Sequence, residues 1–487
     1  MRSFSDLHSE QKEAINFILN NKVGCLTPGC GGGKSIIGLT SFAAMQKLKT
    51  AKTMLVVCVP KGVKETWRKE HLNWEHTKHL RVATLSGTPE HRLKLLRTPH
   101  DVYCISYNSL EWLTENKGSL KFDFVFADEG SCLKGHASKW RRHLINCAPN
   151  PTYRFIATAT PAPHDAMDYW GLCKYLDDGR CLESPNITAF RSRYCKAIPL
   201  GNTGGMRWVL RDKDAVKEIE ERVKHLFYSF ELRKEIPIEV VTFEEELSEE
   251  SLELYQKVEK DQCLNSLLFT ELGQFRAQDS LDAMALSNKL AQMTNGFVYV
   301  DASLRLSDSV LSELESFDQA LNQKKRRTIH LFDDRIDAFK RMVDHIHEQH
   351  GPDVKVAISY LFKYDLEMLQ RAFPTGVSDE EEGVEDRWNR KEIDYLFLQY
   401  GRSSKSLNLQ KGGYILAVYS PTFNWEHDYQ IARRFARQGQ KEPVVYVYRL
   451  YLKDTVDENK IKVLEKREVN HRNFQRKIVR QYKRGKQ

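Results

Sequence analysis

The sequence predicts an α/β protein with two parallel sheets that are joined by a mainly helical insert. Short apolar, β-branched runs alternate with helix-like segments early in the chain, at residues 23–26, 53–59, 102–106, 122–127 and 153–158. Apolar strands that alternate with helices are typical of a parallel sheet covered on both faces. The alternation stops between residues 177 and 323, where charged helical segments dominate, and resumes at residues 354–360, 395–400, 414–419 and 444–450. These later runs predict a second α/β domain.

Length and composition indicate a globular chain with more than one domain. A chain of 487 residues suits two or three domains. We place them at residues 1–178, 179–330 and 331–460, with a tail at 461–487. The apolar run at residues 54–59 is too short to span a membrane, and the first twenty residues are polar and charged. We therefore expect a cytoplasmic protein without membrane attachment or a secretory signal. Ten cysteines without a Cys-x-x-Cys pair predict reduced thiols and no zinc site.

A glycine-rich turn follows the first predicted strand and leads into a helical segment. It reads Thr-Pro-Gly-Cys-Gly-Gly-Gly-Lys-Ser, and its glycines are Gly29, Gly31, Gly32 and Gly33. Such a turn points backbone N–H groups at phosphate oxygens. Lys34 would reach the β- and γ-phosphates of a nucleotide, and the Ser35 hydroxyl would ligate Mg²⁺. Pro28 stands where the strict pattern has a small residue, so an ordinary glycine-rich turn is the alternative.

Several polar residues stand at the ends of the predicted strands, where parallel sheets bind ligands. Asp128 and Glu129 end the run at 122–127. There, Asp128 would hold hydrated Mg²⁺ and Glu129 would polarise the attacking water of a nucleotide hydrolase. Before the first strand, the Gln11 amide could donate to and accept from an adenine edge, although an isolated glutamine is more often a surface residue.

Three basic features lie outside this cluster. Arg434 and Arg437 are three residues apart on a helix expected to start near Asn424, so they would share a face and could reach a γ-phosphate. A surface helix is the alternative. The insert carries a basic and aromatic patch that either faces nucleic acid or is a solvated face with core aromatics: Arg191, Arg193, Tyr194, Lys196, Arg207 and Trp208. The tail at 461–487 has ten Lys or Arg and two Glu, so it is a solvated extension or a nucleic-acid contact.

Taken together, these motifs resemble superfamily-two helicases, and within them the Swi/Snf-type DNA translocases, especially compact members seen in phages. In family order the matching stretches are Gln11, Gly29–Ser35, Val56–Trp67, Ser106–Tyr107, Asp128–Ser131, Thr158–Pro161, Val356–Leu369, Ser403–Gln410 and Gln430–Gln440. The sequence departs from the family pattern at Gly130 and Ser131, where Ala-His is frequent, and at Arg433, which replaces a glycine.

The resemblance implies two tandem RecA-like domains that close on ATP and Mg²⁺. Lys34, Asp128 and Glu129 would form one wall of the ATP site, and Gln430, Arg434 and Arg437 the other. Gln11 would read adenine. Coupling and DNA contact would fall to Pro60, Lys61, Trp67, Ser106, Tyr107, Thr158, Thr160, Ser406, Asn408 and Gln410.

The function expected from this resemblance is an ATP-dependent DNA helicase or translocase. It would move along duplex or branched DNA by gripping the phosphate backbone, in replication, recombination or repair. We expect a monomer in the cytosol of a bacterium or a phage-infected host. The alternatives are an RNA helicase, a catalytically degenerate nucleic-acid-binding regulator, or a subunit of a restriction or packaging complex.

Overall fold

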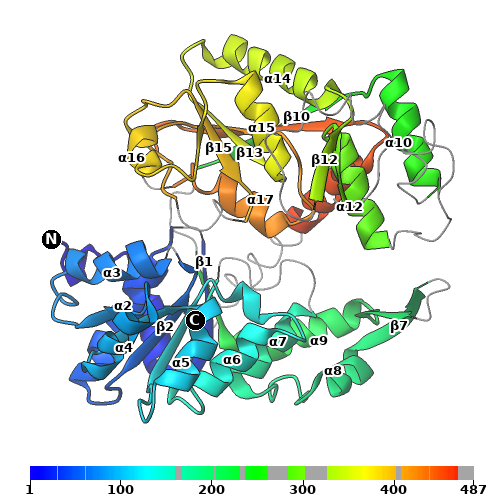
Figure 1. Cartoon of the computed structure of the whole chain (residues 1–487). Helices are drawn as coiled ribbons and strands as arrows, with labels where there is room; N and C mark the ends of the chain where they lie inside the picture. Colours follow the sequence, from blue (N-terminus) through cyan, green and yellow to red (C-terminus); the bar gives the residue numbers. More distant parts are fainter. Residues whose placement is uncertain are drawn as a thin grey trace. The chain divides into compact units, whose positions relative to one another are not determined.

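The computed structural model of the chain describes residues 1–29, 31–60, 62–158, 167–200, 205–230, 236–261, 283–301, 326–401, 407–437 and 439–469. The chain divides into two compact units, Met1–Glu235 with residues 467–469 at the end of the last described helix, and Ile236–Lys466 (Figure 1). Each unit is built on a parallel sheet, as the alternating pattern predicts.

The first unit has a seven-stranded parallel sheet in the order β3-β4-β2-β5-β6-β1-β9. Its strands are β1 (Val23–Pro28), β2 (Met54–Cys58), β3 (Val82–Thr84), β4 (Val102–Ser106), β5 (Phe124–Asp128), β6 (Tyr153–Ala157) and β9 (Phe227–Phe230). Its α-helices are α1 (Ser9–Asn20), α2 (Lys34–Lys47), α3 (Trp67–Glu70), α4 (Pro89–Arg97), α5 (Leu110–Asn116), α6 (Lys139–Cys147), α7 (Asp168–Asp177), α8 (Ile187–Tyr194) and α9 (Lys213–Val223). A hairpin of β7 (Cys195–Leu200) and β8 (Gly205–Leu210) stands apart from the sheet.

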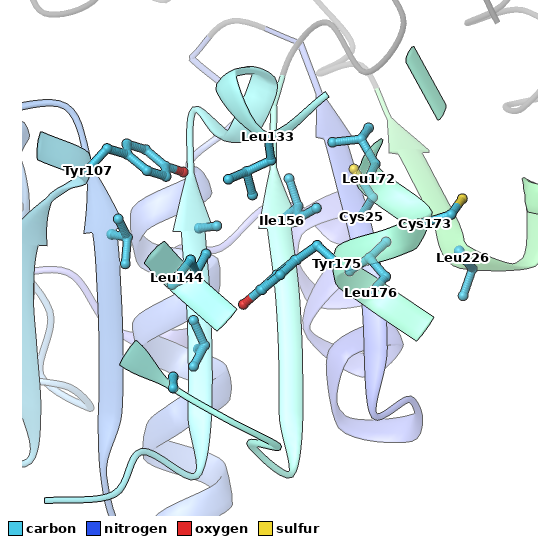
Figure 2. Packing of buried hydrophobic residues seen from close by; sticks show 14 of the residues in the cluster. Cys25, Tyr107, Leu133, Leu144, Ile156, Leu172, Cys173, Tyr175, Leu176 and Leu226 are labelled. Atoms are coloured by element: carbon cyan, nitrogen blue, oxygen red, sulfur yellow. The ribbon is translucent and has the colours of Figure 1, made fainter. Parts of the chain in front are cut away.

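Apolar residues cover both faces of this sheet. Ile37 and Phe42 of α2 pack with Phe126 on one face. On the other face, Leu144 of α6 and Tyr175 of α7 belong to a second cluster, part of which Figure 2 shows. Since the central strands are buried on both faces, they are continuous apolar runs in the sequence. These runs allowed the strands to be predicted.

The second unit has a six-stranded parallel sheet in the order β10-β17-β16-β13-β15-β14. Its strands are β10 (Ile238–Glu245), β13 (Val356–Tyr360), β14 (Val377–Ser378), β15 (Tyr395–Gln399), β16 (Ile415–Val418) and β17 (Val445–Leu452), with an antiparallel pair, β11 (Phe297–Asp301) and β12 (Arg326–His330), beside them. Its helices are α10 (Glu249–Asp261), α12 (Ala283–Thr294), α14 (Asp334–His350), α15 (Lys363–Ala372), α16 (Val384–Asn389), α17 (Trp425–Ala432) and a helix over residues 456–469.

The described parts of the predicted insert at 179–330 fall in both units, since β9 pairs with β1 in the first sheet and β10 pairs with β17 in the second. Helices α9, α10 and α12 account for the charged helical segments predicted between residues 177 and 323. Strands also occur in this range. Among the residues that the structure describes, no helix is long and apolar enough to cross a membrane.

Candidate nucleotide-binding site

The phosphate loop joins β1 to α2 in the context that the motif requires. Gly33 precedes α2 with φ +80°, in the left-handed region that favours glycine. A Cβ on Gly32 would lie 2.6 Å from the Cβ of Pro28, and one on Gly33 would lie 2.3 Å from Nε2 of Gln11. Side chains at these two positions would therefore crowd Pro28 and Gln11. The N-terminus of α2 suits a phosphate group, whereas the N–H groups of Gly29 and Gly32 donate to the carbonyls of Phe230 and Gly29 in this structure.

The side chain of Gln11 is hydrogen-bonded to this loop. It is buried. Nε2 donates to the carbonyl of Gly32 at 3.1 Å, and Oε1 accepts from the N–H of His8 at 3.0 Å. Both ends of the amide are thus bonded to backbone in this structure, and its adenine-reading role stays a prediction.

The acidic pair lies at the end of β5, next to the loop. Lys34 Nζ forms an ion pair with Oε1 of Glu129 and lies 3.9 Å from Oδ1 of Asp128. Glu129 has φ +51°, a conformation that costs a non-glycine residue free energy and is frequent at functional sites. The loop lysine and both carboxylates therefore belong to one cluster, as predicted from their places after β1 and β5.

The carboxylate of Asp128 is held by two donors. Trp67 Nε1 donates to Oδ2 at 3.0 Å, and the N–H of Glu129 donates to Oδ1 at 3.0 Å. The Tyr107 hydroxyl donates to the main-chain carbonyl of the same aspartate at 3.0 Å. Burial raises the pKa of Asp128, and the Lys34 ammonium opposes that rise.

The donors present here suit Mg²⁺. Ser35 lies in the first turn of α2, two residues beyond Gly33, and contributes a hydroxyl. Asp128 contributes a carboxylate. Hydroxyl and carboxylate oxygens beside a phosphate cradle are the ligands that Mg²⁺ takes in phosphate-binding sites.

Trp67 and Tyr107 require a correction. Both were grouped with residues for coupling or DNA contact, but their side chains are 0% and 7% exposed and bond to Asp128. Buried side chains cannot grip a DNA backbone, so of these two roles only coupling suits them. Sequence reasoning missed the bonds to Asp128 because nothing in the local pattern pairs residues so far apart in the chain.

The other residues expected to couple hydrolysis to DNA differ in their exposure and hydrogen bonding. Pro60 is exposed after β2, and Ser106 Oγ lies 3.0 Å from Ser109 Oγ. Thr158 is buried, and its N–H donates to the carbonyl of Leu26 in β1. Three expected residues lie outside the described residues: Lys61, Thr160 and Ser406.

The arginine motif of the second unit departs from the predicted helix. Asn424 caps α17 as expected, accepting from the N–H of His427 at 3.3 Å, but the helix ends at Ala432. Arg434 and Arg437 lie in the turns that follow and do not share a helical face. The chain leaves the helix here to contact residues 407–410, and the N–H of Leu409 donates to the carbonyl of Arg434.

Both arginines nevertheless reach the same neighbouring segment. Arg434 Nη1 lies 3.5 Å from the carbonyl oxygen of Leu407, and Arg437 Nη1 donates to Oδ1 of Asn408 at 2.8 Å. Gln430 is buried in α17 and donates to Glu426 at 3.1 Å. Gln410 is half-buried in the same segment.

The basic and aromatic patch of the insert is largely structural. Arg193 bonds to Glu183 and Glu218, and Tyr194 is buried. The Arg191 guanidinium lies over the ring of Trp208 at 5.3 Å. These contacts favour the solvated face with core aromatics over a nucleic-acid surface for these residues.

A family model, the SNF2-related domain, matches residues 10–288, which is more than half of the chain. The chain belongs to the SNF2-related family. This confirms the predicted resemblance, and the two parallel sheets confirm the predicted fold class. Membership in the SNF2-related family supports an ATPase that acts on DNA.

Relatives of this SNF2-related chain are found in a phage and in eukaryotes. It is 29% identical over 464 residues to "Putative protein p41" of Acyrthosiphon pisum secondary endosymbiont phage 1, with 91% of this chain and 92% of the relative covered. It is 22% identical over 483 residues to "ATP-dependent helicase fft1" of Schizosaccharomyces pombe, and 22% identical over 499 residues to "DNA repair and recombination protein RAD54B" of Mus musculus. These two matches cover 90% and 93% of this chain but only 49% and 54% of the relatives, so the chain spans about half of their length.

A solved structure with similarity to the chain is the "Sulfolobus solfataricus SWI2/SNF2 ATPase core in complex with dsDNA". It has a TM-score of 0.41 and 17% identity, and the match covers 94% of this chain and 91% of that one.

Proposed function

We propose that this chain is an ATP-dependent DNA translocase that uses Mg²⁺. The observation that carries the proposal is the cluster at the phosphate loop, where Lys34 Nζ meets Glu129 and lies 3.9 Å from Asp128, beside a loop whose Gly33 has the left-handed φ that favours glycine. Membership in the SNF2-related family supports the same activity.

The residues of the first unit divide the chemistry of hydrolysis among them. The loop N–H groups and Lys34 would bind the phosphates. Ser35 and Asp128 would hold Mg²⁺, which neutralises developing phosphate charge when bound. Glu129 would orient and polarise the attacking water. Because Glu129 is paired with Lys34 in this structure, phosphate binding would draw the ammonium away and release the carboxylate for that task.

We assign to Arg434 and Arg437, with Gln430 nearby in the sequence, the supply of positive charge to the transferring phosphoryl group. An arginine that contacts a transferring phosphoryl group contributes about 10³ to 10⁵ in rate. Thr158 and Thr160 would couple hydrolysis to movement.

The track would be duplex or branched DNA, gripped through phosphates, in replication, recombination or repair. The support is the similarity to a protein named for DNA repair and recombination, together with the basic tail at 461–487. A more specific form of this proposal is that translocation separates the two DNA strands, as in a helicase. An RNA track and a degenerate ATPase are the competing functions, and we propose a monomer that needs no nuclease or methylase partner.

The test is ATP hydrolysis by the purified chain, alone and with single-stranded DNA, duplex DNA, a four-way junction or RNA. Lys34→Ala and Glu129→Gln should abolish stimulated hydrolysis. Lys340→Ala is the matched control, because Lys340 lies half-exposed on α14 and pairs with Asp337 at 3.0 Å. Stimulation by duplex or junction DNA supports the proposal and identifies the track. No hydrolysis on any nucleic acid, with binding intact, would refute it and leave a degenerate binding protein.

A further inference from the structure

A short segment after β2 has an unusual backbone and two contrasting sides. Residues Gly62–Thr66 form a π-helical turn, which runs into α3 at Trp67. Such widened turns are rare and are frequently found at functional sites. Trp67 is fully buried, whereas Thr66, Arg68 and Lys69 are exposed. One segment therefore carries an indole inward and two cations outward.

The indole is enclosed by the elements that build the nucleotide site. Its ring packs edge-on against Phe126 of β5, with centroids 5.6 Å apart and planes at 60°. On another side it approaches α2 so closely that a Cβ on Gly38 would lie 3.3 Å from Cη2 of the ring. Since β5 ends in Asp128 and α2 begins with Lys34, the ring lies against both elements that carry the site. Any displacement of the segment at 62–70 must move this ring against them.

The polar edge of the ring meets the proposed metal ligand directly. Nε1 donates to Oδ2 of Asp128 at 3.0 Å, while Oδ1 of the same carboxylate is the atom nearest Lys34 Nζ. The indole bond thus fixes which oxygen faces the loop lysine. Rotation of the carboxylate requires that this bond break.

We propose that Trp67 is a positioning residue that couples contact of DNA phosphates with Arg68 and Lys69 to the orientation of the Asp128 carboxylate. The inference rests on the proposed function and deepens it, because it names the surface that senses DNA and the bond that transmits the contact. Phosphates that bind the two cations favour one placement of the 62–70 segment. The indole N–H then holds Asp128 in the orientation that binds Mg²⁺ beside the phosphates.

The decisive comparison is Trp67→Phe against Trp74→Phe. Trp74 is also buried, but its Nε1 donates to a carboxylate oxygen of Glu70 at 2.9 Å and not to Asp128. Both substitutions therefore delete one indole-to-carboxylate bond in the same region. Only the first deletes the bond to the metal ligand.

The first readout is nucleotide binding without turnover, measured by calorimetry with ADP in EDTA and with ADP at increasing Mg²⁺. We expect Trp67→Phe to leave ADP binding in EDTA unchanged. It should raise about tenfold the Mg²⁺ concentration at which the enhancement of ADP binding is half-maximal, which corresponds to about 1.4 kcal/mol. Trp74→Phe should match the wild-type chain. Equal Mg²⁺ dependence in both variants would overturn the role of the indole bond.

The second readout is the coupling between DNA and Mg-ADP in each protein. Coupling between two sites is reciprocal, so Mg-ADP should tighten duplex binding by the factor by which duplex tightens Mg-ADP. Trp67→Phe should reduce that factor toward one, and so should the double change Arg68→Ala with Lys69→Ala. Unchanged coupling in the double variant would overturn the assignment of the sensing surface.

Hydrogen exchange in the wild-type chain keeps the inference testable if Trp67→Phe fails to fold. Duplex DNA alone should protect the amides of residues 62–70 and of residues 126–129 together. Protection of the first segment without the second would refute the transmission. A wild-type chain that binds Mg-ADP but shows no DNA-stimulated hydrolysis would refute the proposed function, while the Mg²⁺ titration would still decide the role of the indole.

Discussion

Replacement of Arg335 by methionine should destabilise the second unit severely. Arg335 lies on α14 and is 0% exposed. Its Nε donates to the carbonyl of Thr294 at 3.1 Å, its Nη1 donates to the carbonyl of Tyr419 at 2.7 Å, and its Nη2 forms an ion pair with Asp457. One guanidinium thus links α14 to the end of α12, to the end of β16 and to the helix over residues 456–469.

The expected loss follows from what the substitution leaves behind. Methionine keeps the apolar stem but cannot donate to the carbonyls of Thr294 and Tyr419. Each carbonyl left without a hydrogen bond costs about 1–3 kcal/mol. The Asp457 carboxylate loses one counter-charge but retains Lys460, whose Nζ donates to it at 2.8 Å. Breaking a buried ion pair costs about 3–5 kcal/mol. Since Lys460 remains, the broken pair should cost less than this, and together with the two unsatisfied carbonyls we expect a loss of about 3–5 kcal/mol in the free energy of unfolding of this unit.

The assay is hydrogen exchange of the β13 amides, which reports the unfolding of this unit separately from the first. Lys340→Met is the matched control, because it lies on the same helix and makes a half-exposed ion pair with Asp337 that is worth about 0–1 kcal/mol. A loss for Arg335→Met that is no larger than the loss for the control would refute the reasoning, because it would mean that the buried bonds contribute nothing beyond a surface pair.

Three further predictions follow from single contacts. Burial, and then the neighbouring guanidinium, lower the pKa of Lys460 to about 7 from its ordinary value of 10.5. The unfolded chain therefore binds more protons between these values, so the free energy of unfolding should rise with pH above 7 by up to about 1.4 kcal/mol per unit, and Lys460→Met should remove that rise in urea titrations at several pH values. Gly33→Ala should weaken ATP binding measured by calorimetry because alanine is strained at φ +80° and its Cβ would displace the Gln11 side chain that holds the loop, whereas Gly118→Ala, also at positive φ but in open space, should retain it. Arg193→Gln should leave the salt dependence of DNA binding unchanged, because its guanidinium is already bonded to two glutamates, and a slope reduced by about 0.9 would instead reveal a phosphate contact.

The parts of the fold that the sequence predicted are those whose signal is local. Buried central strands such as β2 and β5 are continuous apolar runs, and the loop before α2 is marked by glycines that its backbone requires. Strand β9 went unpredicted because it is short, follows a charged helix and is defined by its pairing with β1, about two hundred residues earlier in the chain. Its membership in the first sheet is a property of the fold and not of its own sequence.

The candidate site was predictable in its residue types and less so in its contacts. Lys34, Asp128 and Glu129 could be grouped because carboxyl ends of parallel strands share one edge of the sheet. The helical face predicted for Arg434 and Arg437 was wrong, because contacts with residues 407–410 override the local helical pattern after Ala432. Such a competition between local and tertiary contacts cannot be read from periodicity.

The position of Lys34 implies that nucleotide and Mg²⁺ bind cooperatively. In this structure its ammonium pairs with the Glu129 carboxylate and lies 3.9 Å from Oδ1 of Asp128. A metal ion that approached Asp128 first would have to compete with that ammonium at close range, where like charges repel strongly. Phosphates that bind in the loop would draw the ammonium toward themselves, and the weakened ion pair would favour the approach of another cation to the carboxylates. Calorimetry should therefore detect little binding of Mg²⁺ alone, with marked binding once ADP is present, and Lys34→Met should increase the binding of Mg²⁺ alone. Equal affinity for Mg²⁺ with and without ADP would contradict this account of the ion pair.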